Sequence, residues 1–386
     1  MAKQRGLTGF RRENGAVGVR NHVAILPVDD LSNAAAECVA AHVPGTLALP
    51  HAFGRLQFGE DLELTFRTLI GIGTNPNVAS VVVIGIEPNW TQRVVEGIAK
   101  SGKQVQGFSI EGFGDLKVVE QASRVAQRYL QAASEIQREP VDRSEILITT
   151  KDGESDTTTG LGSCRATAYL IDRWVDEGGT VVFGETSELT GGEHLIAERC
   201  VDDAVRSRFQ EFYDGYIDMI ESTGANLLGS QPTQGNIAGG LSTIEEKALG
   251  NIVKTGSKPV VGALGPAEAP SRQGLHFMDT SSAAAECVTL MAAGGGVVNL
   301  FPTGQGNVIG NPVQPVVKIT ANPKTAESMH DHIDVDCSPL LTAGQSLDEA
   351  GEGLIDLVER TINGRVTAAE ALGHREFTLT KLYRSA

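Results

Sequence analysis

At 386 residues the chain is too long for one small core, which predicts two or three domains. A net charge of −16 and a pI near 5.0 argue against nucleic acid or an anionic membrane as a partner. No segment approaches the roughly 18–20 apolar residues of a membrane span, and residues 1–15 lack the apolar core of a signal peptide. The five scattered cysteines form no C-x-x-C pair, so we expect reduced thiols in a cytoplasmic protein.

Apolar and amphipathic segments alternate along residues 1–140 in the rhythm of an α/β fold. The unbroken β-branched run at 81–86 predicts a strand buried on both faces of a parallel sheet. Ser32 is placed to cap the first helix. Together the patterns predict strands over 22–28, 46–49, 81–86 and 104–110, and helices over 32–42, 60–72, 91–101 and 115–137.

The same rhythm resumes after the polar stretch 138–144, which contains Pro140 and predicts a domain boundary. We therefore expect an α/β protein of two Rossmann-like lobes, residues 1–140 and 141–386, with mostly parallel sheets and a cleft between them. The patterns of the second half predict strands over 146–150, 180–184, 258–263, 296–301 and 316–320, and helices over 165–177, 193–222, 243–254, 281–293 and 346–363.

The segment 302–311 follows a predicted buried strand and interleaves glycines with amide and hydroxyl side chains. Glycines at a strand end let the backbone approach a ligand, and the polar side chains supply neutral hydrogen-bond donors. The alternative is a tight connection between two strands. Because five polar side chains crowd into nine residues, we favour a binding loop, and the donor-rich loop at Asn236 is a weaker candidate. The substrate-binding candidates here are Asn236, Thr303, Gln305, Asn307, Asn311 and, in the next strand, Lys318.

A second candidate loop, residues 50–57, contains His51 and Arg55. Histidine can exchange a proton near neutral pH, and a guanidinium can hold an oxyanion with two parallel hydrogen bonds. A helix-capping histidine and a surface arginine are the alternative. Arg20 and Asn21, just before the first strand, are further substrate-binding candidates that would reach the cleft from below.

Acidic and hydroxyl residues gather in two more loops that follow predicted strands. In residues 151–160, Lys151 adjoins Asp152, Ser155, Asp156 and Thr158. These acids could bind a divalent cation, or one of them could be a base tuned by the lysine, or the stretch could be an exposed helix start. Glu185, at the end of another strand, is also a catalytic candidate. In another loop after a buried strand, residues 87–92, Trp90 beside Asn89 and Gln92 could shape a pocket or equally anchor a domain interface. Residues 245–247 are a weaker candidate, for which solvated charge is favoured.

No G-x-S-x-G, H-E-x-x-H or P-loop motif is present, which excludes those hydrolase and NTPase templates. Several motifs in order resemble the altronate/galactarate dehydratase family over nearly the whole chain. They are GFRRENG at 9–15, GVRN at 18–21, GESD at 153–156, EKALG at 246–250, PTGQG at 302–306 and GNP at 310–312. The resemblance implies an α/β lyase that acts on a 2-hydroxy acid.

Departures from the family pattern refine this expectation. Family dehydratases carry cysteines in the loops that match Arg55, Pro88 and Asp152, so a thiolate metal site of that kind would be dismantled. Iron or another divalent metal is implied by the resemblance alone, and the cofactor stays unknown. The small N-terminal SAF-type domain of the family is absent from the chain, which predicts a separate small α subunit in a homo- or hetero-oligomer.

The motifs FGRLQFG at 53–59, IEP at 86–88, GETSE at 184–188 and TKLYRSA at 380–386 resemble those of carbon–sulfur lyases in this family. Such enzymes release sulfite from 3-sulfolactate and give pyruvate. Sulfite leaves more readily than hydroxide, so metal assistance could be dispensable. We expect Arg55 and Lys151, with Ser155 and Thr158, to hold the sulfonate.

The base that removes the C2 proton is left open among His51, Asp152, Asp156 and Glu185. A sugar-acid dehydratase is the first alternative function, and a non-catalytic binding subunit is the second.

Overall fold

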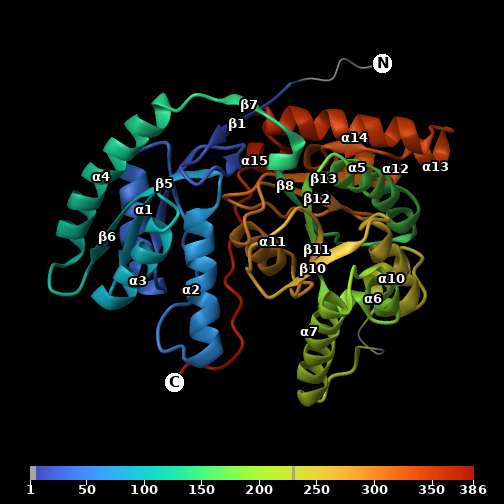
Figure 1. Cartoon of the computed structure of the whole chain (residues 1–386), viewed down its shortest axis with the longest axis horizontal. Helices are drawn as coiled ribbons and strands as arrows, with labels where there is room; N and C mark the ends of the chain where they lie inside the picture. Colours follow the sequence, from blue (N-terminus) through green and yellow to red (C-terminus); the bar gives the residue numbers. More distant parts are fainter. Residues whose placement is uncertain (1–5, 228–230) are drawn as a thin grey trace.

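The computed structural model of the chain describes residues 6–227 and 231–386, and it confirms the α/β class. Its strands form a four-stranded sheet, a seven-stranded sheet and a small three-stranded sheet. The two larger sheets are parallel throughout their described pairings. Figure 1 shows the smaller parallel sheet with its helices on the left and the larger one on the right.

The four-stranded sheet has the order β4-β3-β5-β6. Its central strand β5 is buried at every residue, as the apolar run predicts for a strand covered on both faces. One apolar core includes α2 and α3, and another includes α1 and α4, so helices cover both faces. The elements are β3 (His22–Pro27), α1 (Asn33–His42), β4 (Thr46–Ala48), α2 (Gly59–Thr74), β5 (Val78–Gly85), α3 (Pro88–Ala99), β6 (Gln104–Ser109) and α4 (Asp115–Glu135).

The seven-stranded sheet has the order β10-β11-β9-β8-β12-β13-β14. From β8 the chain first builds one half of the sheet and then returns to β12 to build the other, so a topological switch point lies between β8 and β12. The strands are β8 (Leu147–Thr150), β9 (Thr180–Phe183), β10 (Val260–Leu264), β11 (Gly274–Met278), β12 (Val298–Pro302), β13 (Val316–Thr320) and β14 (Val335–Asp336). The pattern analysis did not predict β11 or β14.

Helices α5 and α14 pack against each other and share one apolar core with this sheet. Helix α11 belongs to another core, where it packs against α2 of the first sheet. The two sheets are therefore joined by a continuous apolar cluster. The remaining helices include α5 (Cys164–Asp176), α6 (Glu193–Arg199), α7 (Asp203–Ser222), α9 (Gln234–Ala238), α10 (Ile244–Val253), α11 (Ala284–Ala293), α12 (Pro323–Ser328), α13 (Pro339–Thr342), α14 (Leu347–Ile362) and α15 (Ala368–Ala371).

The predicted boundary region becomes part of the small antiparallel sheet β2-β1-β7. Strand β1 (Leu7–Arg11) pairs with both β2 (Val17–Gly18) and β7 (Glu139–Val141). Pro140 can occupy β7 because the strand lies at the edge of this sheet. The division at residue 140 and the cleft between two lobes remain predictions.

Two local predictions are wrong. The expected helix 193–222 is divided into α6 and α7, because Asp202 caps α7 by accepting a hydrogen bond from the Val205 amide at 2.9 Å. Ser32 lies at the start of α1 but makes no side-chain capping bond, and it donates instead to Asp29 at 2.9 Å. Trp90 packs edge-on against Phe66 with 5.3 Å between ring centroids, which favours a core anchor over a pocket wall.

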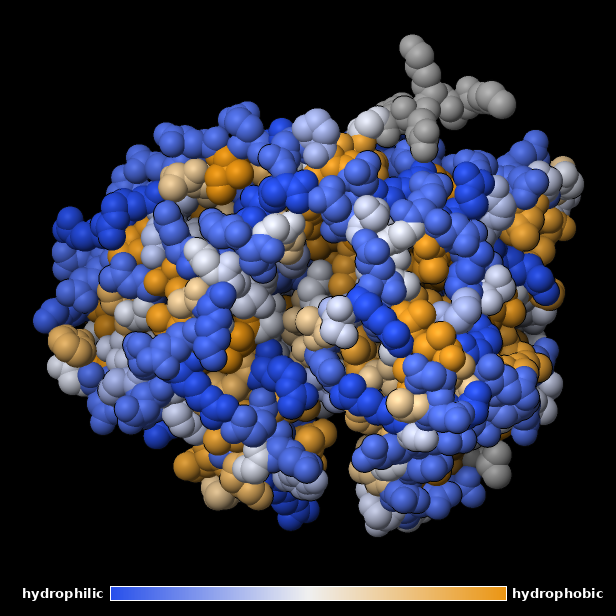
Figure 2. Space-filling view, in the orientation of Figure 1, coloured by the Kyte–Doolittle hydropathy of each residue, from blue (hydrophilic) through white to orange (hydrophobic). Residues whose placement is uncertain are grey.

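In the described part of the chain, no helix is long and apolar enough to cross a membrane. Residues 1–5, which belong to the segment 1–15 that lacks the apolar core of a signal peptide, lie outside the described residues. Figure 2 shows a face dominated by hydrophilic residues and hollowed at its lower edge, between the ends of α2 and α7.

Candidate active site

The loops after β8 and β12 meet at the switch point of the seven-stranded sheet. A bridge between Gly153 and Thr303 extends the strand pairing beyond the regular sheet. The Gly153 amide donates to the Pro302 carbonyl at 3.1 Å, and the Gln305 amide donates to the Glu154 carbonyl at 2.9 Å. Ligands of open α/β sheets bind outside the carboxyl ends of the strands at such a point. The fold thus brings two of the predicted loops together.

A buried cluster of four charges lies beneath these loops. Lys151 Nζ donates to Glu185 Oε1 at 2.6 Å, and Lys254 Nζ donates to Glu185 Oε2 at 2.7 Å. Lys254 also binds Asp152 Oδ1, and the Asp152 amide donates to Glu185 Oε2 at 3.1 Å. Each of the four side chains is at most 3% exposed. Two cations and two anions therefore neutralise one another inside the protein.

The pKa values of the cluster reflect burial opposed by mutual attraction. Burial disfavours the charged form of Asp152, but the ammonium groups of Lys254 and Lys151 outweigh it and hold the pKa low. Burial dominates at Glu185 and raises its pKa, although both lysines oppose that shift. The carboxylates likewise outweigh burial at Lys151 and Lys254 and raise the pKa of each ammonium. Asp152 is thus the carboxylate most firmly held in its ionised form.

Glu185 sits in a backbone conformation that non-glycine residues rarely adopt. Its φ of 71° and ψ of 59° are left-handed, directly after the end of β9. The Glu185 amide donates to Thr280 Oγ1 at 2.8 Å, which anchors this turn to the segment after β11. Strained residues of this kind persist where the surrounding structure over-determines them and cluster at functional sites. The strain places Glu185 between the two lysines.

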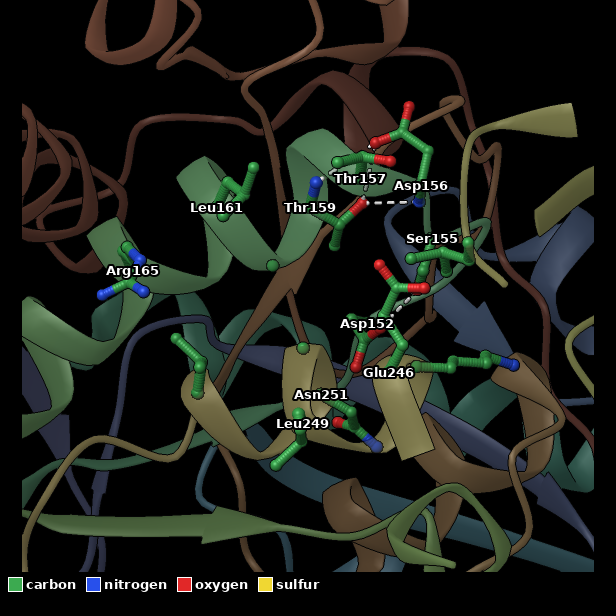
Figure 3. A pocket seen from close by; sticks show the side chains of 15 residues that line it. Asp152, Ser155, Asp156, Thr157, Thr159, Leu161, Arg165, Glu246, Leu249 and Asn251 are labelled. Atoms are coloured by element: carbon green, nitrogen blue, oxygen red, sulfur yellow. Dashed lines mark hydrogen bonds between the residues drawn. The ribbon is translucent and has the colours of Figure 1, made fainter. Parts of the chain in front are cut away.

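A cavity of about 240 Å³ opens beside the cluster, between the loop after β8 and helix α10. Figure 3 shows Asp152 and Ser155 facing it from one side, with Asn251 and Leu249 of α10 opposite. Ser155 Oγ donates to Asp152 Oδ2 at 2.7 Å. The side chains of Glu185, Lys151 and Lys254 are absent from the cavity lining. Among the cluster's charges, Asp152 is the member that reaches the cavity.

Asp156 also lines the cavity, but its carboxylate organises the loop around it. It accepts hydrogen bonds from the Thr158 amide at 2.8 Å, the Thr158 hydroxyl at 2.6 Å and the Thr159 amide at 3.1 Å. Asn322 Nδ2 donates to its other oxygen at 2.8 Å. Asp156 and Thr158 therefore satisfy each other, which supports a structural role for both.

The amide side chains of the 302–311 loop largely build the loop itself. Asn307 Oδ1 accepts from the Ile309 amide at 2.7 Å, and Asn311 Oδ1 accepts from the amides of Val313 and Gln314 at 3.0 Å. The hydroxyl of Thr303 accepts from the Gly306 amide at 3.1 Å.

Two further amides connect this loop to the loop after β8 by way of α9. Gln305 Nε2 donates to the Gly235 carbonyl at 2.9 Å, and Asn236 Nδ2 donates to the Ser155 carbonyl at 2.8 Å. The predicted loops are therefore cross-linked around the cavity, and most of their polar groups are already used.

The loop after β4, which contains His51 and Arg55, adjoins the four-stranded sheet rather than the seven-stranded one. His51 is buried, its Nε2 lies 2.9 Å from the Pro27 carbonyl oxygen, and burial lowers its pKa, so the ring is neutral near pH 7. Arg55 is exposed and lines a separate cleft of about 320 Å³ together with Gln57 and Lys381. Lys151 does not line that cleft. The cation beside Arg55 in this structure is thus Lys381, and the pairing of Arg55 with Lys151 stays a prediction.

Arg20 and Asn21 precede β3 and therefore lie at the opposite end of that strand from the loop of His51. Arg20 forms a salt bridge with Glu370 at 2.7 Å and donates to the carbonyl of Arg365 at 2.8 Å. Asn21 Nδ2 donates to the Ala133 carbonyl at 2.7 Å. Both side chains fasten distant segments together, which favours structural roles.

Sequence patterns missed Lys254 and misjudged Lys247. Lys247 is only 8% exposed, and its Nζ lies 3.1 Å from Glu188 Oε1, so the expectation of solvated charge is wrong at this position. Lys254 follows α10 and is completely buried. A lysine at a helix end normally remains in solvent, so composition carried no signal for it. The spacing of seven residues, which places Lys247 and Lys254 on one helix face, was the available clue.

A divalent metal does not fit these residues. Both oxygens of Glu185 and one of Asp152 already accept hydrogen bonds from lysine ammonium groups, which would repel a dication. No group of three or more His, Cys, Asp or Glu side chains in the described ranges is arranged to hold a metal ion. The cysteines in those ranges are free.

Comparison with known proteins adds independent information. Residues 143–385 match the family described as D-galactarate/Altronate dehydratase, C-terminal, and residues 9–134 match D-galactarate dehydratase/Altronate hydrolase, second domain. The (2R)-sulfolactate sulfo-lyase subunit beta of Chromohalobacter salexigens is 60% identical over 386 residues, which cover 100% of this chain and 99% of that protein.

More distant relatives are sugar-acid dehydratases. The galactarate dehydratase (L-threo-forming) of Escherichia coli is 30% identical over 78% of this chain and 59% of that protein. The altronate dehydratase of the same organism is 29% identical over 98% of this chain and 78% of that protein. Similarity to the sulfo-lyase subunit is thus about twice as high and extends to both ends.

Proposed function

The chain belongs to the D-galactarate/altronate dehydratase family, and within it we propose that the chain is the β subunit of a (2R)-sulfolactate sulfo-lyase. The observation that carries the proposal is 60% identity along the whole of both chains, against 29–30% for the sugar-acid dehydratases. The reaction would convert 3-sulfolactate into pyruvate and sulfite. Its partner would be a small α subunit with a SAF-type domain.

The proposed reaction is a β-elimination. A base removes the C2 proton, the electron pair of the C2–H bond forms the C2–C3 double bond, and sulfite leaves with the electron pair of the C3–S bond. The resulting enol of pyruvate then tautomerises. Sulfite leaves as an anion. Cationic groups and hydrogen-bond donors around the sulfonate therefore help the leaving step.

Asp152 is the base we favour. It lines the cavity, and among the described residues its Oδ2 accepts a hydrogen bond from the Ser155 hydroxyl alone. The lysines keep the carboxylate ionised but also lower its pKa and so its basicity, and the assignment therefore rests on its position in the cavity. Glu185 and Lys254 are positioning residues in this scheme, since they hold the Asp152 amide and carboxylate in place. We favour it over the other three candidates because both oxygens of Glu185 already accept from lysines and Asp156 is bonded by Thr158 and Asn322. His51 follows a strand of the four-stranded sheet.

Three cations are candidates for holding the sulfonate. Lys247 and Arg165 line the same cavity as Asp152, whereas Arg55 lies in the cleft with Lys381. The variants Lys247→Gln, Arg165→Gln and Arg55→Ala separate them, with Arg124→Ala on an exposed face of α4 as the control. Loss of turnover in Arg55→Ala, with the other two variants active, would support the sequence-based assignment. Wild-type turnover by Arg55→Ala would contradict that assignment and leave Lys247 and Arg165.

The function is tested by coexpressing the chain with its small subunit and measuring sulfite release from sulfolactate. We expect sulfite and pyruvate in equal amounts and no dehydration of altronate or galactarate. Asp152→Asn should lower kcat by about 10²–10⁴-fold, as expected for loss of a general base. Asp331→Asn, at an exposed position, serves as the control. Dehydration of a sugar acid instead would favour the first alternative, and inactivity on all three substrates the second.

A further inference from the structure

Lys318 is a buried lysine without a hydrogen-bonding partner. It lies in the middle of β13 and is 0% exposed, and its Nζ makes no hydrogen bond to any described residue. Its strand neighbours Val317 and Ile319 belong to the core under α5 and α14. Because side chains alternate along a strand, Lys318 points to the opposite face of the sheet.

Lys151 of the charge cluster points to the same face. Phe301 of β12 pairs in register with Lys318, and Lys151 Nζ lies 5.6 Å from the centre of the Phe301 ring. Strands β8, β12 and β13 are consecutive in the sheet, so the backbones of Lys151 and Lys318 are about 10 Å apart. The two lysines flank one aromatic side chain.

Two histidines with unpartnered nitrogens lie on the segments beside Lys318. The amide of Asp334, two residues after His332, donates to the Lys318 carbonyl at 2.9 Å. The rings of His332 and His374 stack with 5.4 Å between centroids and an interplanar angle of 17°. The Nδ1 atom of each ring is buried and has no hydrogen-bond partner among the described residues. Both residues are otherwise half-buried, which leaves this side of the cluster closest to solvent. Burial and the Lys318 charge lower the pKa of His332.

The acidic groups near Lys318 are engaged elsewhere. Asp334 accepts hydrogen bonds from Arg365 at 2.9 Å, from the Ala368 amide at 3.0 Å and from the Lys318 backbone amide at 3.1 Å. Glu376 Oε2 accepts from the Gly310 amide at 2.6 Å. These carboxylates lie close enough to attract the ammonium, yet burial still lowers the pKa of Lys318 to about 8.

We propose that Lys318, His332 and His374 form a binding site for a small oxyanion. Three nitrogens in this cluster lack partners among the described residues, and a buried ammonium without an acceptor is unfavourable. An anion with two or more oxygens can accept from the ammonium and from neutral imidazoles that carry their proton on Nδ1. Sulfite, sulfate, phosphate and a carboxylate share this chemistry. The inference goes beyond the proposed function and holds whichever acid the enzyme cleaves.

An anion bound at this site would also affect the glycine-rich loop at 302–311. A methyl group on Gly310 would lie 2.3 Å from the His374 carbonyl oxygen, so the loop packs directly on the histidine segment. Glu376 holds the same glycine through its amide. The proposed oxyanion site therefore adjoins the loop after β12, which lies at the switch point of the sheet.

Calorimetric titration of the full chain with sulfate tests the proposal without any turnover. We expect saturable binding that Lys318→Met weakens about 10- to 100-fold, the ratio for one charge-assisted hydrogen bond. Lys324→Met, which removes an exposed lysine from nearby α12, should bind like the wild type. Near pH 8, binding should take up protons, seen as a heat that depends on the buffer, and Lys318→Met should lose this uptake.

Parallel titrations with sulfite, phosphate and pyruvate distinguish the anion's source. Binding of pyruvate alone would identify a carboxylate site, and binding of the inorganic anions a site for the leaving group or an effector. If Lys318→Met does not fold, His332→Gln replaces it, with the same weakening expected. Failure of all four anions to bind, or equal binding by the wild type and Lys318→Met, would overturn the proposal and leave Lys318 with bound water alone.

Discussion

Two lysines beside the seven-stranded sheet, Lys254 and Lys318, are buried to the same degree and differ in their partners. Lys254 contacts Asp152 and Glu185, and its ammonium is fully compensated. Lys318 has no acceptor for its ammonium among the residues that the structure describes. The pKa of Lys254 is raised by its carboxylates despite burial, whereas burial lowers that of Lys318. The comparison teaches that burial alone does not assign a role to a lysine. The acceptors within reach decide whether a buried lysine stabilises the fold or can bind a ligand.

The largest test of this comparison replaces each lysine by methionine. Lys254→Met leaves Asp152 and Glu185 with Lys151 as their one remaining cation, so we expect a loss of about 3–5 kcal/mol in the free energy of unfolding. Lys318→Met removes an unpaired charge and should leave stability unchanged or raise it. Urea denaturation of both variants measures the difference. Equal destabilisation by the two substitutions would show that Lys318 stabilises the fold as Lys254 does.

The pH dependence of stability is a smaller test. The unfolded chain keeps the Lys318 proton up to its ordinary pKa of 10.5, whereas the folded chain releases it near pH 8. Between these values the unfolded state binds more protons, so this group makes stability rise with pH, by about 3 kcal/mol in total.

The rise is measured as the difference between the wild type and Lys318→Met, since other lysines and tyrosines titrate in the same range. Saturating sulfate should flatten it by supplying the missing acceptor. A wild type whose stability parallels that of Lys318→Met from pH 7 to about 10 would contradict the shift.

The smallest expected effect concerns the contact between Gly310 and His374, beside the proposed oxyanion site. Gly310→Ala would force its new methyl group against His374 and cost about 1–2 kcal/mol. Gly215, on α7, has open space around it, so Gly215→Ala should stabilise the helix by about 0.5–1 kcal/mol. Thermal denaturation checks both signs. Sulfate affinity should fall in Gly310→Ala and stay constant in Gly215→Ala.

Several parts of the molecule were predictable because they depend on local pattern. The apolar run that became β5 and the loops that follow β8 and β12 were located from hydrophobic periodicity and glycine placement. The division of 193–222 into two helices was missed, since a single capping aspartate at 202 outweighed a continuous amphipathic pattern. Strand β11 was missed as well, although its pairing with β9 and β10 completes the sheet.

The residue types of the candidate site, the loops that carry them and the α/β class followed from the amino-acid sequence alone, because strand ends and glycine-rich turns are local features. Tertiary structure decided which of those residues meet. It placed Lys254 beside Asp152 and Glu185, placed Lys381 rather than Lys151 in the cleft with Arg55, and left Lys318 without an acceptor. Charge pairing depends on distances of a few ångströms between segments far apart in the chain, and sheet order and register set those distances.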